Sequence, residues 1–182
     1  MPQRVIGWAA LALFLLSIPF ANWWLTRYGL WDAPLIGPVP SAVWVIGIAF
    51  VVRDIGQLGA GRLWAWLAIV AGIAISYVVA DARVATASAI AFAWSESTDA
   101  LVFTPMAARG TGRAFLAGVA ISGYAASVVD SALFVRIAFG SYAGWWQLTV
   151  AKVLFVMLAT PIAWLVRQTW MRTDAVPGYI TV

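Results

Sequence analysis

The chain has 182 residues, of which 64% are hydrophobic and 10% charged, and its mean hydropathy of +0.92 lies outside the range of soluble proteins. The net charge is +4, but the basic residues occur singly between apolar segments, so we expect no nucleic-acid-binding surface. The absence of cysteine and histidine excludes disulfides, thiolate and imidazole metal sites and Ser-His-Asp catalysis. We therefore predict an integral membrane protein that is not an enzyme and that holds no metal or cofactor.

The apolar segments predict six transmembrane helices, because a bilayer core of about 30 Å requires about 20 apolar residues in a helix. They lie at about 5–25, 39–58, 63–80, 84–104, 114–139 and 146–167. The links between them are short and rich in turn-forming residues, as in the segment from Trp31 to Pro40. We predict one six-helix domain over residues 1–172 and a cytoplasmic tail over 173–182. The first segment is interpreted as a retained helix, because no small-residue cleavage motif follows it.

The arginines that flank these segments predict the orientation in the membrane. Two of them, Arg27 and Arg83, fall on the side opposite the N-terminus. Seven fall on the side of the N-terminus: Arg4, Arg53, Arg62, Arg109, Arg113, Arg167 and Arg172. This imbalance predicts a multi-pass protein of the cytoplasmic (inner) membrane with both termini in the cytoplasm.

Five charged residues are candidates for a position within the membrane, where each costs about 2.5–3.5 kcal/mol at the centre of a helix: Glu96, Asp99, Asp130, Arg136 and Lys152. Arg136 is close enough to the outer end of its helix for its charge to reach the interface. Glu96 is near the predicted midplane, and Asp99 follows three residues later on the same helix face. Asp130 and Lys152 have matching depths, so we expect an ion pair that could serve only to fix the register of two helices. The acids outnumber the lysine and we expect no second cation inside the membrane. The excess negative charge points to a site for a cation, for protons or for a ligand rich in N–H donors.

Three other features have two interpretations each. Asn22, near the end of the first helix, is either a cap or loop residue or a ligand contact. Arg53 and Asp54 close the second helix either as a solvated ion pair or as part of a gate. In the third helix, small residues recur every four positions, and we interpret them as a packing seam. These residues are Ala68, Gly72, Ser76 and Ala80.

Several motifs together resemble the queuosine-precursor transporter family, also called vitamin uptake transporters. They are the stretch ASAIAFAWSESTD from Ala87 to Asp99, the Val-Asp-Ser motif around Asp130, the Arg53-Asp54 pair and Lys152. The resemblance covers about residues 15–170. It implies a fold similar to the substrate-binding subunits of vitamin importers. It also implies uptake of 7-deazaguanine bases, such as 7-cyano-7-deazaguanine, for queuosine biosynthesis.

A guanine-like base presents a ring N–H and an exocyclic amine on one edge, and a carboxylate can accept both hydrogen bonds. Glu96 is the first candidate for this contact and Asp99 the second. Phe92 or Trp94, together with Phe20, could stack on the flat ring. The remaining candidate contacts are Asn22, Ser88, Ser127, Asp130 and Lys152.

Two functions stay open on the sequence alone. The first is a small secondary transporter for a purine-like solute, which a protonatable acid could couple to protons. The alternative is a substrate-binding subunit, for a vitamin or nucleobase, that requires an energising partner complex. A homo-oligomer is compatible with both.

Overall fold

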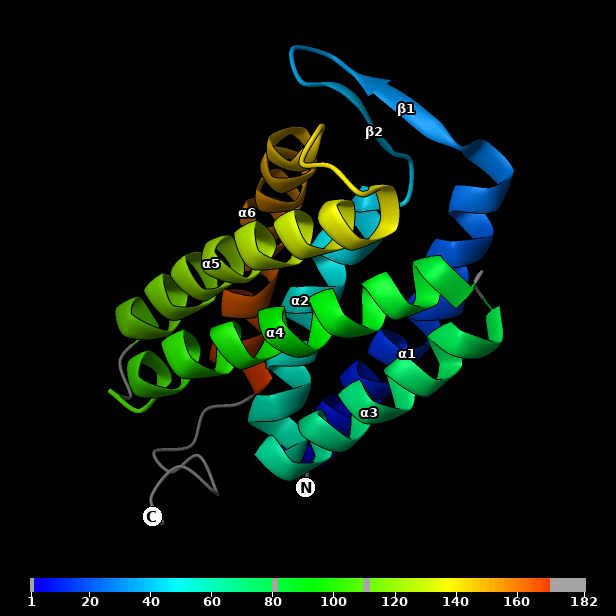
Figure 1. The fold of residues 1–182 in the computed structure, drawn as a ribbon. Helices are drawn as coiled ribbons and strands as arrows, with labels where there is room; N and C mark the ends of the chain where they lie inside the picture. The colour runs from blue at the N-terminus through cyan, green and yellow to red at the C-terminus, as the bar shows by residue number, and fades with distance from the viewer. Residues whose placement is uncertain (1, 80–81, 110–111, 171–182) are drawn as a thin grey trace.

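The computed structural model describes residues 2–79, 82–109 and 112–170. Within these residues the chain forms six helices and no sheet core, as expected for an all-α membrane protein (Figure 1). The helices are α1 (Pro2–Tyr28), α2 (Val43–Ala60), α3 (Arg62–Val79), α4 (Ala82–Ala107), α5 (Gly112–Phe139) and α6 (Trp145–Trp170). Their ends lie within four residues of the predicted ones. The predicted tail, 173–182, lies outside the described residues.

Four of the helices are long and apolar enough to cross a membrane, among the residues that the structure describes. These spans are Gln3–Tyr28, Val43–Ala60, Gly112–Phe139 and Trp145–Val166. The apolar part of α3 is shorter, and α4 carries Glu96 and Asp99 near its centre. Both helices nevertheless pack into the bundle, α4 most extensively against α5 and α3 against α1 and α4. The four strongly apolar helices can therefore hold the protein in lipid, and α3 and α4 are held in the bundle by packing against the other helices.

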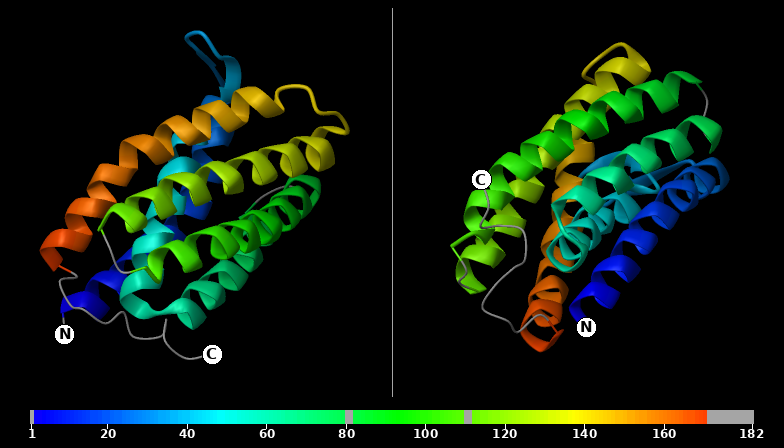
Figure 2. Two further views of the ribbon diagram at one scale, coloured as in Figure 1. Left: turned by 90° about the vertical axis from the view of Figure 1, so that its left-hand side faces the viewer. Right: turned by 90° about the horizontal axis from the view of Figure 1, so that it is seen from below.

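A short hairpin joins α1 to α2, where the sequence predicted only a turn-rich link. Strands β1 (Leu30–Ala33) and β2 (Gly37–Pro40) pair antiparallel. Leu35 in the turn and Gly37 at the start of β2 have positive φ angles of 67° and 92°. Ala33 and Val39 are buried against α5 and α6, which holds the hairpin on the bundle. We call this end of the bundle the hairpin end. The opposite end, where α1 begins and α6 ends, is the terminal end (Figure 2).

Near the terminal end, two glycines allow α1 and α2 to pack closely. A Cβ atom on Gly7 would lie 2.3 Å from the backbone nitrogen of Ala60. A Cβ atom on Gly59 would lie 2.6 Å from the Cα atom of Gly7. Small residues of this kind let helix backbones approach in lipid, where no hydrophobic effect drives the helices together.

Gly7→Ala is therefore expected to destabilise the protein by about 1–3 kcal/mol, because backbone atoms must move to make room. Thermal or denaturant unfolding in detergent would measure the change. Gly72→Ala is the control, since its Cβ would meet only side-chain atoms, the nearest being Cδ1 of Ile18, which can rotate. Equal destabilisation by the two substitutions would contradict the close approach of α1 and α2.

Candidate binding site within the helix bundle

A cavity of about 150 Å³ lies in the half of the bundle nearer the hairpin end. All six helices contribute to its lining, and Pro40 of β2 and Ala42 line it beside the hairpin. Most of the lining is apolar. A cavity of about 150 Å³ in another protein binds benzene, so this space suits a small ring compound.

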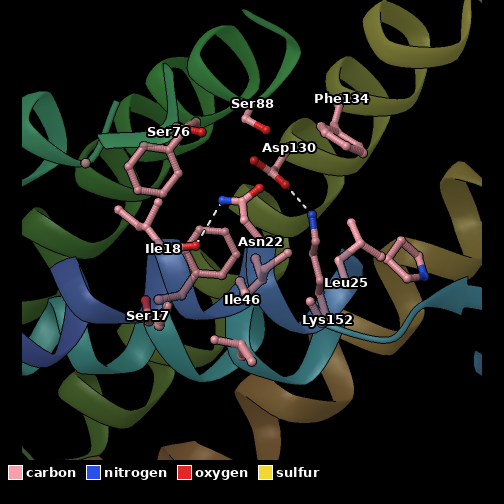
Figure 3. A pocket seen from close by; sticks show the side chains of 18 of the residues that line it. Ser17, Ile18, Asn22, Leu25, Ile46, Ser76, Ser88, Asp130, Phe134 and Lys152 are labelled. Atoms are coloured by element: carbon pink, nitrogen blue, oxygen red, sulfur yellow. Dashed lines mark hydrogen bonds and ion pairs between the residues drawn. The ribbon is translucent and has the colours of Figure 1, made fainter. Parts of the chain in front are cut away.

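The polar side chains of the cavity gather on one side of it. Figure 3 shows the side chains of Asn22, Ser88 and Asp130 pointing toward one another. The amide nitrogen of Asn22 donates to the carbonyl of Ile18 at 2.9 Å, so its amide oxygen remains as an acceptor. Within the described ranges, the hydroxyl groups of Ser76 and Ser88 make no hydrogen bond. These groups are available to a ligand.

The only carboxylate in the cavity lining, as far as the structure describes it, belongs to Asp130. The Nζ atom of Lys152 donates to Oδ2 of Asp130, which confirms the expected ion pair between α5 and α6. Among the described residues, the Oδ1 atom has one long contact of 3.5 Å, with the hydroxyl of Ser95. The pair is therefore neutral as a unit, and it keeps one carboxylate oxygen able to accept from a ligand.

One wall of the cavity is aromatic. The rings of Phe14 and Phe92 stack with centroids 5.7 Å apart and planes 15° apart, and both residues line the cavity. Trp94, a predicted alternative for stacking, is 63% exposed and faces away from the bundle. Phe20 packs against Trp24 and Trp44 instead. Of the three predicted stacking residues, Phe92 is the one that lines the cavity.

A second polar cluster lies around Arg53, and we call it the Arg53 network. Its Nε atom is 2.8 Å from Oε2 of Glu96, Nη2 is 2.6 Å from Oδ2 of Asp99, and Nη1 is 3.2 Å from Oδ1 of Asp54. Nη1 also donates to the side-chain oxygen of Gln57 at 3.1 Å. Each of these five side chains is at most 2% exposed. The network ties α2 to α4.

The Arg53 network corrects two expectations. The prediction of a solvated helix end at Arg53 and Asp54 is wrong, because this face of α2 is covered by the bundle and both side chains are buried. The prediction that Lys152 is the only cation available to the acids within the membrane is also wrong, because Arg53 contacts Glu96 and Asp99. Hydropathy placed Arg53 at a helix end, but it does not reveal which side of that end is buried.

The structure separates the predicted binding residues into two groups. Those that line the cavity are Asn22, Ser88, Phe92, Asp130 and Lys152. Glu96 and Asp99 do not line it, because they face Arg53. Ser127 does not line it either, and its hydroxyl donates to the carbonyl of Gly123 at 2.6 Å.

Sequence reasoning missed several lining residues. Gly72 and Ser76 line the cavity, although their spacing was interpreted as a packing seam. The four-residue spacing shows that Gly72 and Ser76 share a helix face. The serine was the only residue of that face that indicated a polar environment. Phe14 has no signal of its own, since it lies in an uninterrupted apolar segment.

Along both α2 and α4, the residues of the Arg53 network come after the residues that line the cavity. In α2, Phe50 lines the cavity and Arg53 comes three residues later. In α4, Phe92 lines the cavity and Glu96 comes four residues later. Because both helices run from the hairpin end to the terminal end, the network lies about one turn beyond the cavity, on its terminal side.

Among the described residues, no group of three or more metal-ligating side chains is positioned to hold a metal ion. A protein-family model described as "Putative vitamin uptake transporter" matches residues 76–166, which is half of the chain. The matched segment includes Glu96, Asp99, Asp130 and Lys152. No curated protein and no solved structure matched the chain.

Proposed function

Because the chain belongs to the vitamin uptake transporter family, we propose that it imports a 7-deazaguanine base, such as 7-cyano-7-deazaguanine, across the cytoplasmic membrane. One observation supports this substrate above others. A carboxylate oxygen of Asp130 that has a long contact with Ser95 but lies outside the ion pair, and the amide oxygen of Asn22, face a small cavity with an aromatic wall.

The hydrogen-bonding groups of the cavity match those of a deazaguanine. Asp130 and Asn22 supply acceptors for the ring N–H and the exocyclic amine. The hydroxyls of Ser76 and Ser88 can donate to a ring carbonyl or a nitrile. Asp130 takes the place that the sequence suggested for Glu96, because Arg53 holds the Glu96 carboxylate away from the cavity. Stacking on Phe92 would add about 1–3 kcal/mol.

The charge of the cavity favours a neutral solute. Lys152 is the only cation in the described lining, and Asp130 neutralises it. A vitamin with a free carboxylate, such as biotin, would bring an unpaired negative charge beside Asp130. A purine-like base avoids this cost, because it is flat, uncharged and rich in N–H donors.

The flanking arginines support an orientation in which the cavity opens toward the outside of the cell. Because Arg53 is buried, it no longer counts among the arginines on the side of the N-terminus. Six arginines then remain on that side and two on the other, so the excess of positive charge stays on the side of the N-terminus. Both termini then face the cytoplasm, and the hairpin end with its cavity faces outward. Uptake by the purified protein in liposomes tests whether it acts alone. Uptake only with an added partner complex would favour the role of a substrate-binding subunit.

Binding itself can be tested with two serine substitutions that remove the same hydroxyl group. Ser88→Ala is expected to weaken binding of 7-cyano-7-deazaguanine about 2- to 10-fold, as for the loss of one neutral hydrogen bond. Ser127→Ala is the matched control and is expected to leave the affinity unchanged, because its hydroxyl bonds only within α5. Isothermal titration in detergent would measure both affinities.

A panel of guanine, 7-cyano-7-deazaguanine, 7-aminomethyl-7-deazaguanine and biotin would define the substrate class. We expect a deazaguanine to raise the melting temperature of the protein and biotin to leave it unchanged. If none of the purine-like compounds stabilises the protein, the proposed substrate is wrong. If Ser127→Ala weakens binding as much as Ser88→Ala does, the cavity is not the binding site.

A further inference from the structure

The Arg53 network contains more negative than positive charge. Asp54, Glu96 and Asp99 surround a single guanidinium, so the network would carry a charge of −2 with every carboxyl group ionised. None of these side chains is more than 2% exposed, so water cannot stabilise the excess charge. An unpaired carboxylate in such surroundings is strongly disfavoured, and it takes up a proton instead.

Two oxygen atoms in the network are free to hold such a proton. Within the described parts of the chain, Oε1 of Glu96 and Oδ1 of Asp99 are buried and have no hydrogen-bond partner. The other oxygen of each carboxyl group lies against Arg53. A proton can therefore bind to either group without first displacing the guanidinium, although the neutral carboxyl group then attracts Arg53 less strongly.

Among the described residues, no cation other than Arg53 forms an ion pair with these three carboxyl groups. From α5, Asp130 is the next charged group that faces Glu96, and Lys152 of α6 already neutralises it. The arginines of α1 and α3 lie at the ends of those helices: Arg4, Arg27 and Arg62. On α2, the only other polar member of the network is the neutral side chain of Gln57.

We propose that the Arg53 network is a proton-binding site that couples substrate uptake to proton entry, with the exchangeable proton on Glu96 or Asp99. The proposal rests on the proposed function, since coupling requires a transported substrate. The proton forms an O–H bond on the unshared carboxyl oxygen when the site is open to the outside. It leaves to water when the site opens to the cytoplasm.

The position of the network explains how the proton would act on transport. Arg53 bridges α2 and α4 about one turn beyond the cavity, so its ion pairs hold together the two helices on the terminal side of the substrate. A proton on Glu96 or Asp99 removes the charge that attracts Arg53. The bridge is then weaker, and α2 and α4 can separate to release the substrate.

The chemistry of the network favours a proton over a metal cation. Each carboxyl group already places one oxygen against Arg53, and hard cations require several oxygen ligands at once. A proton requires a single oxygen. A sodium ion at the same place would sit beside the positive guanidinium without a complete shell of oxygen atoms.

The test uses the full chain in liposomes with the membrane voltage held at zero and 7-cyano-7-deazaguanine as the probe. With one proton per substrate, a pH difference of one unit, acidic outside, sustains about a tenfold accumulation. We expect this accumulation for the parent protein and for Asp32→Asn. The latter is the matched control, because it removes an exposed carboxylate of β1 outside the network.

Glu96→Gln or Asp99→Asn is expected to abolish the accumulation while exchange of substrate for substrate continues. The proposal is overturned if both variants accumulate substrate as the parent does, or if a sodium gradient drives uptake in place of the proton gradient. Absence of exchange in the parent would instead contradict the proposed function.

Infrared spectroscopy of the purified protein tests whether a carboxyl group of the network is protonated, and it requires no transport assay. We expect the absorption of a protonated carboxyl group at neutral pH, and we expect Glu96→Gln or Asp99→Asn to remove it. Asp32→Asn should leave the absorption intact. If neither network variant changes it, the network holds no proton.

Discussion

Replacing Arg53 with methionine is expected to destabilise the protein by at least about 3–5 kcal/mol, enough to remove much of the stability of an ordinary domain. Methionine fills much of the space but leaves Asp54, Glu96 and Asp99 buried with no counter-charge. Unfolding in detergent, together with the yield of monodisperse protein on size exclusion, would measure the effect.

The control for this prediction is Arg136→Met, because Arg136 is an exposed arginine that contacts the carbonyl of Gly140 and the ring of Tyr142. Its loss should cost less than about 1 kcal/mol. Neutralising two acids, in the triple variant Arg53→Met with Glu96→Gln and Asp99→Asn, should recover part of the lost stability. If Arg53→Met and Arg136→Met are equally stable, the network does not hold α2 against α4.

Lys152→Met is the second substitution with a large expected effect, about 3–5 kcal/mol of destabilisation. It leaves Asp130 without its cation beside a largely apolar cavity. The double variant Asp130→Asn with Lys152→Met removes both charges and should recover most of the loss. A double-mutant cycle of thermal unfolding in detergent would give the coupling between the two residues.

The same double variant separates folding from binding. It should fold but bind 7-cyano-7-deazaguanine about 10- to 150-fold more weakly, as expected for the loss of a charged hydrogen-bond acceptor. A double variant that folds and binds as the parent does would show that the carboxylate of Asp130 contacts no substrate.

The helices could be predicted from the sequence because lipid imposes a simple rule on their length and composition. The Asp130–Lys152 pair could be predicted for the same reason, since counting residues from each helix end gives the depth of both side chains. The hairpin was missed. Its pairing depends on Ala33 and Val39 packing against helices that come much later in the chain.

The Arg53 network shows where counting residues is insufficient. Depth along a helix follows from residue number, but the direction in which a side chain points depends on which helices are neighbours. α2 and α4 are separated by a whole helix in the sequence, and no pattern in either one reveals that Arg53 reaches Glu96 and Asp99. The same limit assigned Glu96 to the substrate and left Ser76 out of the cavity lining.

The ion pairs between α2 and α4 also have a consequence for biosynthesis. During translation α2 emerges from the ribosome before α4, so Arg53 reaches the membrane while its acidic partners are still unsynthesised. Each helix alone carries charges that oppose its release from the insertion channel into lipid. Insertion is therefore easiest if α2 stays beside the channel until α4 arrives, so that the two helices enter the bilayer as a neutralised unit.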